Sequence, residues 1–294
     1  VIESPELAKV VDQVWPATDS AIVGIEYIDV ESLHDYDYHR YCLAREHLRL
    51  KRSTRLSEDI DMVALARWFS NRGDRESAGE AYYIQGAYLN WLGENTDAMQ
   101  MLKEAEHQST TPIVRGMIYY KMGRISESEQ LFDIALENYH QALPHLQEAA
   151  LPLYLASVYR ELGRMSNDEN RNAYFDSALV QARLYRDTIL YLDIRYAQLS
   201  ANQSQSPEVA SICQYLCHQA GIKRYAYDLV KYYIRSQKAD SARIYLDILA
   251  ADSTAQTWSK QQYVLWNSQY LRLKGKNDEA YEELYQLYNE NYSI

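Results

Sequence analysis

The chain has 294 residues but only 10 Gly and 6 Pro, the residues from which tight turns are usually built. These low contents disfavour a β-sandwich or β-barrel, and a hydrophobic content of 47% excludes wholesale disorder. The formal net charge of −11 disfavours nucleic-acid binding through this segment, because an acidic surface repels the phosphate backbone.

The first 75 residues predict irregular helix pairs. Capping residues such as Asp19 and Asp35 precede apolar stretches, which is typical of helix starts. The predicted helices cover about 19–30, 35–52 and 57–71. Within the second of them, Arg45, Arg49 and Arg52 share one face. That face is either solvated and offsets nearby acids, or it binds an anion or a partner.

From residue 76 onward, the helical pattern repeats. A helix over 76–92 is ended by Gly93, and residues 94–97 begin the next helix. We expect the helix over 76–92 to be the first helix of its pair. An alternative alignment with the repeat pattern would make it the second helix of the preceding pair. At an offset of 30 residues, the positions Gly86, Gly93, Ala98, Leu102 and Ala105 align with Gly116, Gly123, Ser128, Phe132 and Ala135.

Further copies follow along the chain. Ala156 and Gly163 continue the pattern, with a longer loop expected over 165–170. Residues 186–220 fit a helix pair that is split around 200–207. A 38-residue offset then relates 230–249 to 268–287. Self-similarity with such a period is typical of a solenoid, in which each helix pair buries its outer face against the next pair.

The glycine, tyrosine and alanine positions of these copies resemble those of the tetratricopeptide repeat (TPR). The resemblance covers 76–185 and 222–290 and is degenerate, since the leading Trp is missing from each copy. It implies an all-α fold, a right-handed superhelix of about eight antiparallel helix pairs. Residues 1–75 then form degenerate pairs and residues 76–294 form TPR-like repeats, in one continuous array.

Adjacent tyrosines point to a binding surface. The chain holds 28 Tyr but only 3 Phe, and Tyr82-Tyr83 and Tyr119-Tyr120 are neighbouring pairs in which one ring can face the core and the other a groove. Each single tyrosine can instead be a half-buried packing residue. In TPR arrays the first-helix surface lines a concave groove for peptides, and Tyr, Trp and Arg dominate interfaces. The candidate partner-binding residues are Tyr83, Asn90, Trp91, Tyr120, Lys121 and Arg160.

The sequence offers no catalytic, metal or cofactor motif, so we expect a binding protein that is not an enzyme. Cys213 and Cys217 could meet on one helix face, but without further ligands they predict core cysteines. The Lys/Asn clamp of chaperone-binding TPR domains is also absent, because Tyr83, Ala87, Ile113 and Met117 occupy its positions. The expected partner is a protein or peptide held on the groove.

A second resemblance concerns the stretches over 18–29, 41–53 and 57–99, which look like envelope TPR proteins of Bacteroidota-type bacteria. This resemblance implies a location in the cell envelope, on the periplasmic side, with the cytoplasm as the alternative. It also offers an alternative function, the extracytoplasmic sensor portion of a membrane-anchored transcription regulator. Any anchoring would then use segments outside these 294 residues.

Overall fold

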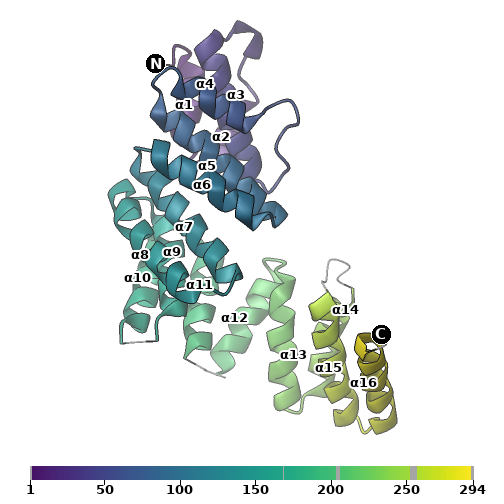
Figure 1. The fold of residues 1–294 in the computed structure, drawn as a ribbon. Coiled ribbons are helices and arrows are strands. Elements are labelled where there is room, and N and C mark those ends of the chain that lie inside the picture. Colours follow the sequence, from purple (N-terminus) through teal and green to yellow (C-terminus); the bar gives the residue numbers. More distant parts are fainter. Residues whose placement is uncertain (1, 168, 203–205, 252–256, 293–294) are drawn as a thin grey trace. The chain divides into compact units, whose positions relative to one another are not determined.

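The computed structural model describes residues 2–167, 169–202, 206–251 and 257–292. Within these ranges it contains sixteen α-helices, two short 3-10 helices and no β-strand (Figure 1). Successive α-helices pack against each other, which confirms the all-α prediction and its TPR-like helix pairs. No described helix is both long and apolar enough to cross a bilayer.

The chain folds into two compact units. Unit 1 comprises residues 1–181 and unit 2 comprises residues 182–294. The division falls inside helix α10 (Asn170–Tyr185), within the region predicted as TPR-like repeats. A single continuous array therefore stays a prediction.

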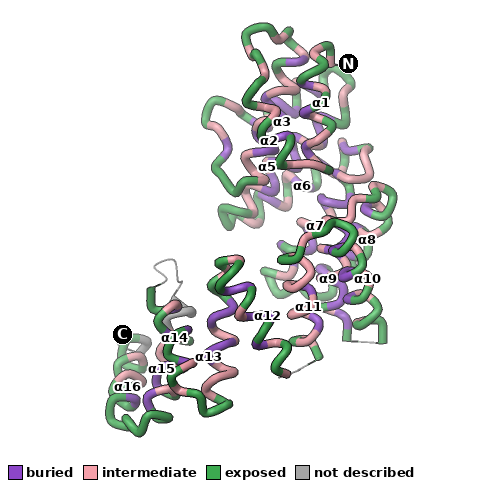
Figure 2. The backbone as a smooth tube through the Cα atoms, turned by 180° about the vertical axis from the view of Figure 1, so that it is seen from behind, coloured by how far each residue is buried: buried purple, intermediate pink, exposed green. Residues whose placement is uncertain are grey.

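Unit 1 contains two rows of helices that follow an N-terminal pair. Helix α3 contacts α5 and α5 contacts α7, so alternate helices are neighbours, and α5 also packs against α6 as predicted for the first member of a pair. We call α3, α5, α7 and α9 the first helices and α4, α6, α8 and α10 the second helices. Buried residues lie where helices face one another (Figure 2). The bounds are α1 (Pro5–Gln13), α2 (Thr18–Ile25), η1 (Val30–Ser32), α3 (Asp35–Lys51), α4 (Met62–Ser70), α5 (Arg75–Leu92), α6 (Asn95–Gln108), α7 (Pro112–Ser128), α8 (Phe132–Ala149) and α9 (Pro152–Met165).

The N-terminal part differs from the prediction in three places. Helix α1 was not predicted, although Ser4 caps it and Pro5 opens it. Helix α2 ends at Ile25, five residues before the expected end. Helix α4 begins at Met62 because its cap is Asp61, whose carboxylate accepts from two backbone N–H groups, rather than a residue in 57–59.

The structure also corrects the repeat register. The 30-residue offset equates Phe132 with Leu102, yet Leu102 is fully buried and Phe132 is 56% exposed. An offset of 37 residues aligns buried positions with buried positions. The aligned pairs are Gly86 with Gly123, Ala98 with Ala135, Leu102 with Tyr139, and Ala105 with Ala142.

Backbone geometry supports the corrected register. Gly93 and Gln130, which are 37 residues apart, both have positive φ angles (86° and 62°) just after a first helix. Gly123, which the earlier register places at a turn, instead lies inside α7 against the ring of Tyr139. An added Cβ at Gly123 would approach the Tyr139 Cε1 to 2.6 Å, so this position requires glycine for close helix packing.

Unit 2 has an interior of apolar residues and tyrosines. Residues 186–220 form a helix pair as predicted, and residues 203–205 of the expected break lie outside the described part. Cys213 and Cys217 are buried free cysteines, and burial raises the pKa of Cys213 to about 12. The bounds are α11 (Thr188–Ala201), α12 (Pro207–His218), η2 (Lys223–Tyr225), α13 (Ala226–Arg235), α14 (Ala239–Ala250), α15 (Thr257–Leu273) and α16 (Asn277–Tyr292).

Candidate functional site

A cavity of about 270 Å³ lies on the first helices of unit 1, and we call it the groove pocket. All four first helices contribute to it, together with the turn after α3. Four of the six candidate residues line it, namely Tyr83, Trp91, Tyr120 and Lys121. The remaining lining residues are His47, Leu50, Lys51, Ser53, Thr54, Ala87, Met117 and Tyr154.

The two candidate tyrosines differ in accessibility. Tyr120 is half-buried, with its ring 5.9 Å from that of Tyr139. Tyr83 lies on the expected helix face but is only 2% exposed, because Trp15 of the N-terminal region covers it at a ring distance of 5.8 Å. Burial raises the pKa of both hydroxyls. Tyr83 is therefore a wall of the pocket and offers no open surface.

The other two candidate aromatic and basic residues are better placed for contact. Trp91 is 49% exposed at the end of α5, and its ring lies 5.7 Å from that of Tyr88. Lys121 is half-buried on α7, where burial and the neighbouring Arg124 lower its pKa. Together they place an indole and an ammonium group at the edge of one cavity.

Asn90 and Arg160 do not line the groove pocket. The Asn90 side chain donates to the Asn95 side-chain oxygen at 3.1 Å and so links α5 to α6. Arg160 pairs with Glu161 at 2.6 Å. Both residues have structural partners within unit 1, which the helix pattern alone could not reveal.

Glu161 is a fully buried carboxylate held by three guanidinium groups. Arg160 and Arg164 donate to it, and an Arg124 nitrogen lies 3.5 Å away. Burial by itself would raise the pKa of Glu161, but the arginines more than offset this effect and lower it. The cluster joins α7 to α9 beside the groove pocket.

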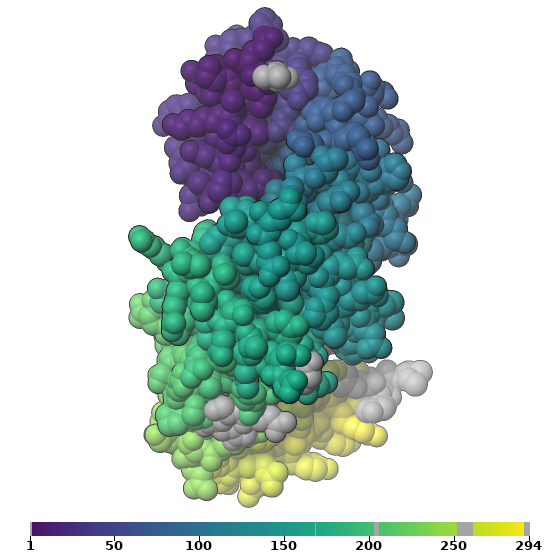
Figure 3. All heavy atoms as spheres, turned by 90° about the vertical axis from the view of Figure 1, so that its left-hand side faces the viewer, coloured from purple at the N-terminus to yellow at the C-terminus, as the bar shows by residue number. Residues whose placement is uncertain are grey.

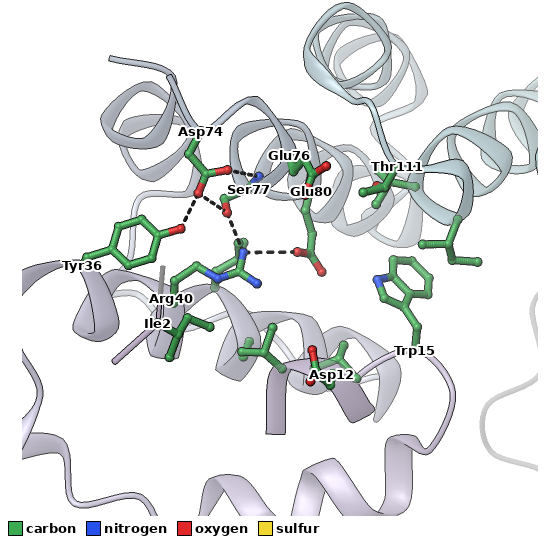
Figure 4. Close-up of a pocket in the computed structure, with 16 residues that line it drawn as sticks. Ile2, Asp12, Trp15, Tyr36, Arg40, Asp74, Glu76, Ser77, Glu80 and Thr111 are labelled. Atoms are coloured by element: carbon green, nitrogen blue, oxygen red, sulfur yellow. Dashed lines mark hydrogen bonds and ion pairs between the residues drawn. The ribbon is translucent and has the colours of Figure 1, made fainter. Parts of the chain in front are cut away.

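A second buried polar cluster lies between α3 and α5 (Figure 4). His47 is fully buried, and its Nδ1 lies 2.7 Å from one carboxylate oxygen of Glu80. The other carboxylate oxygen of Glu80 lies 3.7 Å from the Arg40 guanidinium. Burial lowers the pKa of His47 more than Glu80 raises it, which favours a neutral ring that donates from Nδ1. The His47 Nε2 has no hydrogen-bond partner among the described atoms, and His47 lines the groove pocket.

Lys51 completes the inner wall of the pocket. Its ammonium nitrogen lies 4.3 Å from the Trp15 ring centroid and 4.6 Å from that of Tyr154, and it donates a hydrogen bond to the Tyr154 hydroxyl. Burial lowers the pKa of Lys51 to about 7. Such cation–π contacts orient an aromatic ring over the charge.

Charges are divided between the two helix rows around this site. Helix α7 carries three basic residues, Arg115, Lys121 and Arg124, and one acidic residue, Glu127. Helix α8 carries Asp133, Glu137 and Glu148 but no Lys or Arg. The first-helix side of this pair is therefore basic within an acidic chain.

Sequence reasoning missed the contribution of the N-terminal residues. Trp15, His47, Lys51 and Tyr154 come from segments up to 139 residues apart, so no local motif joins them. The one available signal was the apolar spacing Leu7, Val10, Val11 and Val14 after Ser4-Pro5, which is typical of a capped amphipathic helix.

Two residues of the arginine face of α3 make contacts within unit 1. Arg45 bonds the buried Glu46 at 2.9 Å and lies 3.3 Å from Asp59, while Arg49 donates to the Arg55 carbonyl. These contacts tie the turn after α3 to the helix. Across the described residues, no group of three His, Cys, Asp or Glu side chains is placed to hold a metal ion.

Comparison with known proteins gives one relevant similarity. No protein-family model matches the chain. The photosystem I assembly protein Ycf3 of Chaetosphaeridium globosum is 33% identical over 109 residues, which cover 35% of this chain and 64% of that protein. The match thus spans slightly less than two thirds of the relative. Together with the packed helix pairs, it supports a TPR-type protein.

Proposed function

We propose that this protein is a non-enzymatic scaffold that binds a segment of a partner protein in the groove pocket of unit 1. The observation that carries the proposal is the convergence of Trp91, Tyr120 and Lys121, from two helices, on one cavity. A cavity of about 270 Å³ is at the lower end of ligand sites, which suits one or two side chains of a peptide rather than a large cofactor.

Two further observations favour a protein partner. The similar protein is named as an assembly protein of photosystem I. Helix α7 carries three basic residues against one acidic residue, whereas α8 carries no Lys or Arg, and basic side chains attract acidic segments. Aromatic and cationic groups at a cavity edge are the residue types that dominate interface energies.

The test is selection of a library of short random peptides on the full chain, followed by affinity measurement with enriched peptides. We expect Trp91→Ala and Lys121→Ala each to weaken peptide binding by about tenfold or more, because both residues line the groove pocket. Phe132→Ala and Lys103→Ala are matched controls, since these residues are exposed on second helices. Equal affinity of the pocket variants and the wild type, with folding intact, would reject the groove pocket as the binding site.

The proposed location is the bacterial cell envelope. The alternative function is that of the sensor portion of a membrane-anchored transcription regulator. Both rest on the sequence resemblance alone. Reading the complete gene tests them. A leader encoded before Val1 supports the envelope location, and an apolar stretch of membrane-spanning length encoded after Ile294 supports the anchored regulator.

A further inference from the structure

The N-terminal segment, residues 2–17, lies against the first helices of unit 1. The backbone N–H groups of Glu3 and Ser4 donate to the carboxylate of Asp37, which is only 3% exposed, at 3.1 and 2.7 Å. Val10 and Val14 pack with Ala44 and Leu48 of α3. In the space-filling view, the purple N-terminal atoms lie directly beside the blue helices (Figure 3).

Trp15 anchors the other end of this segment in the groove. Its ring lies 4.4 Å from that of His47 and 5.5 Å from that of Tyr154, and Lys51 lies over its face. The Tyr154 hydroxyl also lies 3.3 Å from the Trp15 carbonyl oxygen, to which it donates. Three of these contacting residues, His47, Lys51 and Tyr154, line the groove pocket as well. Trp15 and the groove pocket therefore share three wall residues.

Between its two anchors, the segment buries Leu7, Val10 and Val14 but also borders a cavity. A cavity of about 310 Å³ separates it from α5 and α7, as Figure 4 shows. This volume is about ten times the share of one water molecule in the liquid, so the contact is not a dry core. Asp12 of the segment faces this cavity together with Glu76, Glu80 and Arg40, and Arg40 lies 3.7 Å from Glu80.

We propose that the N-terminal segment is a built-in occupant of the groove, and that a partner segment binds by presenting its own tryptophan or tyrosine in place of Trp15. This inference rests on the proposed function, because it assumes that peptides bind at the groove. The geometry explains the preferred anchor. Lys51 attracts the face of an electron-rich ring, most strongly that of tryptophan, and Tyr154 donates to the carbonyl of the anchoring residue.

The test uses a fluorescent synthetic peptide of residues 2–17 as the probe and the full chain as the receptor. In the wild type the chain's own N-terminal segment competes with the probe. The apparent affinity of the probe is therefore reduced, because it can bind only those molecules whose own segment has left the groove. We expect Trp15→Ala in the receptor to raise the affinity for the probe by about tenfold or more. A probe in which Trp15 is replaced by Leu should lose binding, and one with Tyr should bind more weakly than the parent.

A second receptor variant guards against misfolding of Trp15→Ala. Asp37→Asn weakens the distant anchor without altering the groove, and it should also increase probe binding. Equal probe affinity for the wild type and both variants would overturn the built-in occupant. Peptides selected from the random library separate the two proposals. If they bind the groove pocket with the same affinity in wild type and Trp15→Ala, the proposed function stands and this inference fails.

Discussion

Unit 1 and unit 2 use the same helix-pair pattern but fill their interiors differently. Unit 1 buries ionisable side chains completely, including Glu46, His47 and Glu161. Among the described residues of unit 2, the buried polar side chains are Gln198, Asn267 and Ser268. There, tyrosine hydroxyls such as those of Tyr196 and Tyr225 donate to carboxylates.

This difference indicates which part of a repeat scaffold can form a binding site. Taking a charge out of water is costly unless it is paired, so the charges buried in unit 1 require specific partners from several helices. One of these buried groups, His47, also lines the groove pocket. In unit 2, hydrogen bonds pair individual tyrosine hydroxyls with single carboxylates, an arrangement that requires less precise geometry. Its described residues form no comparable cluster of buried charges.

The largest expected effect is that of Glu161→Ala. Removal of the buried carboxylate leaves Arg124, Arg160 and Arg164 without their shared acceptor, and we expect a loss of about 3–5 kcal/mol in the free energy of unfolding. Urea denaturation measures it. The contrasting variant in unit 2 is Tyr225→Phe, which removes the hydroxyl that donates to Asp193 and accepts from Arg224, and it should cost less, about 1.5–3 kcal/mol. Similar losses for both variants would erase the proposed difference between the interiors.

An intermediate effect is expected for Gly123→Ala. The new methyl group would meet the fully buried ring of Tyr139 at 2.6 Å, which forces α7 and α8 apart and should cost about 1–3 kcal/mol. Thermal unfolding with a calorimeter detects this change. Ser268 of unit 2 is the matched control, because it precedes a positive-φ residue by the same seven positions and already carries a side chain. Ser268→Ala should be nearly neutral, and a neutral Gly123→Ala would contradict the close packing.

The smallest effect is a pH dependence that arises from Lys51. Its pKa is about 7 in the folded chain but near 10.5 when unfolded, so between these values the unfolded chain holds one more proton. The free energy of unfolding should therefore rise with pH above 7, by at most about 1 kcal/mol from pH 7 to 8. The ammonium group faces Trp15 and Tyr154, and the charges of Glu80 and Lys121 also act on it.

Urea midpoints at pH 7 and pH 8 measure this slope. Lys51→Met should flatten it, whereas Lys103→Met, which changes an exposed lysine on α6, should leave it unchanged. Identical slopes for Lys51→Met and the wild type would show that the lysine beside Trp15 is not desolvated in the way that its surroundings indicate.

Part of the site could be predicted from the sequence. The first-helix face was inferred from the spacing of Tyr83, Trp91, Tyr120 and Lys121, and these four residues do line one cavity. Their role in binding stays a prediction. The burial of Tyr83 could not be foreseen, because it depends on Trp15, which approaches from a distant part of the chain.

The repeat register shows the same limit. Offsets of 30 and 37 residues differ by seven residues, which is close to two helical turns, so both keep the same face of a helix toward the core. The burial of the aligned residues, the positive φ angles after the first helices and the packing of Tyr139 against Gly123 distinguish them.

The sequence by itself determined that the chain is helical, where most of its helices lie and that they form repeated pairs, because periodicity and capping act over a few residues. The tertiary structure decided which residues share the groove pocket, which charges are buried and which segment covers Tyr83. These features depend on contacts between residues far apart in the chain, and local periodicity carries no information about such contacts.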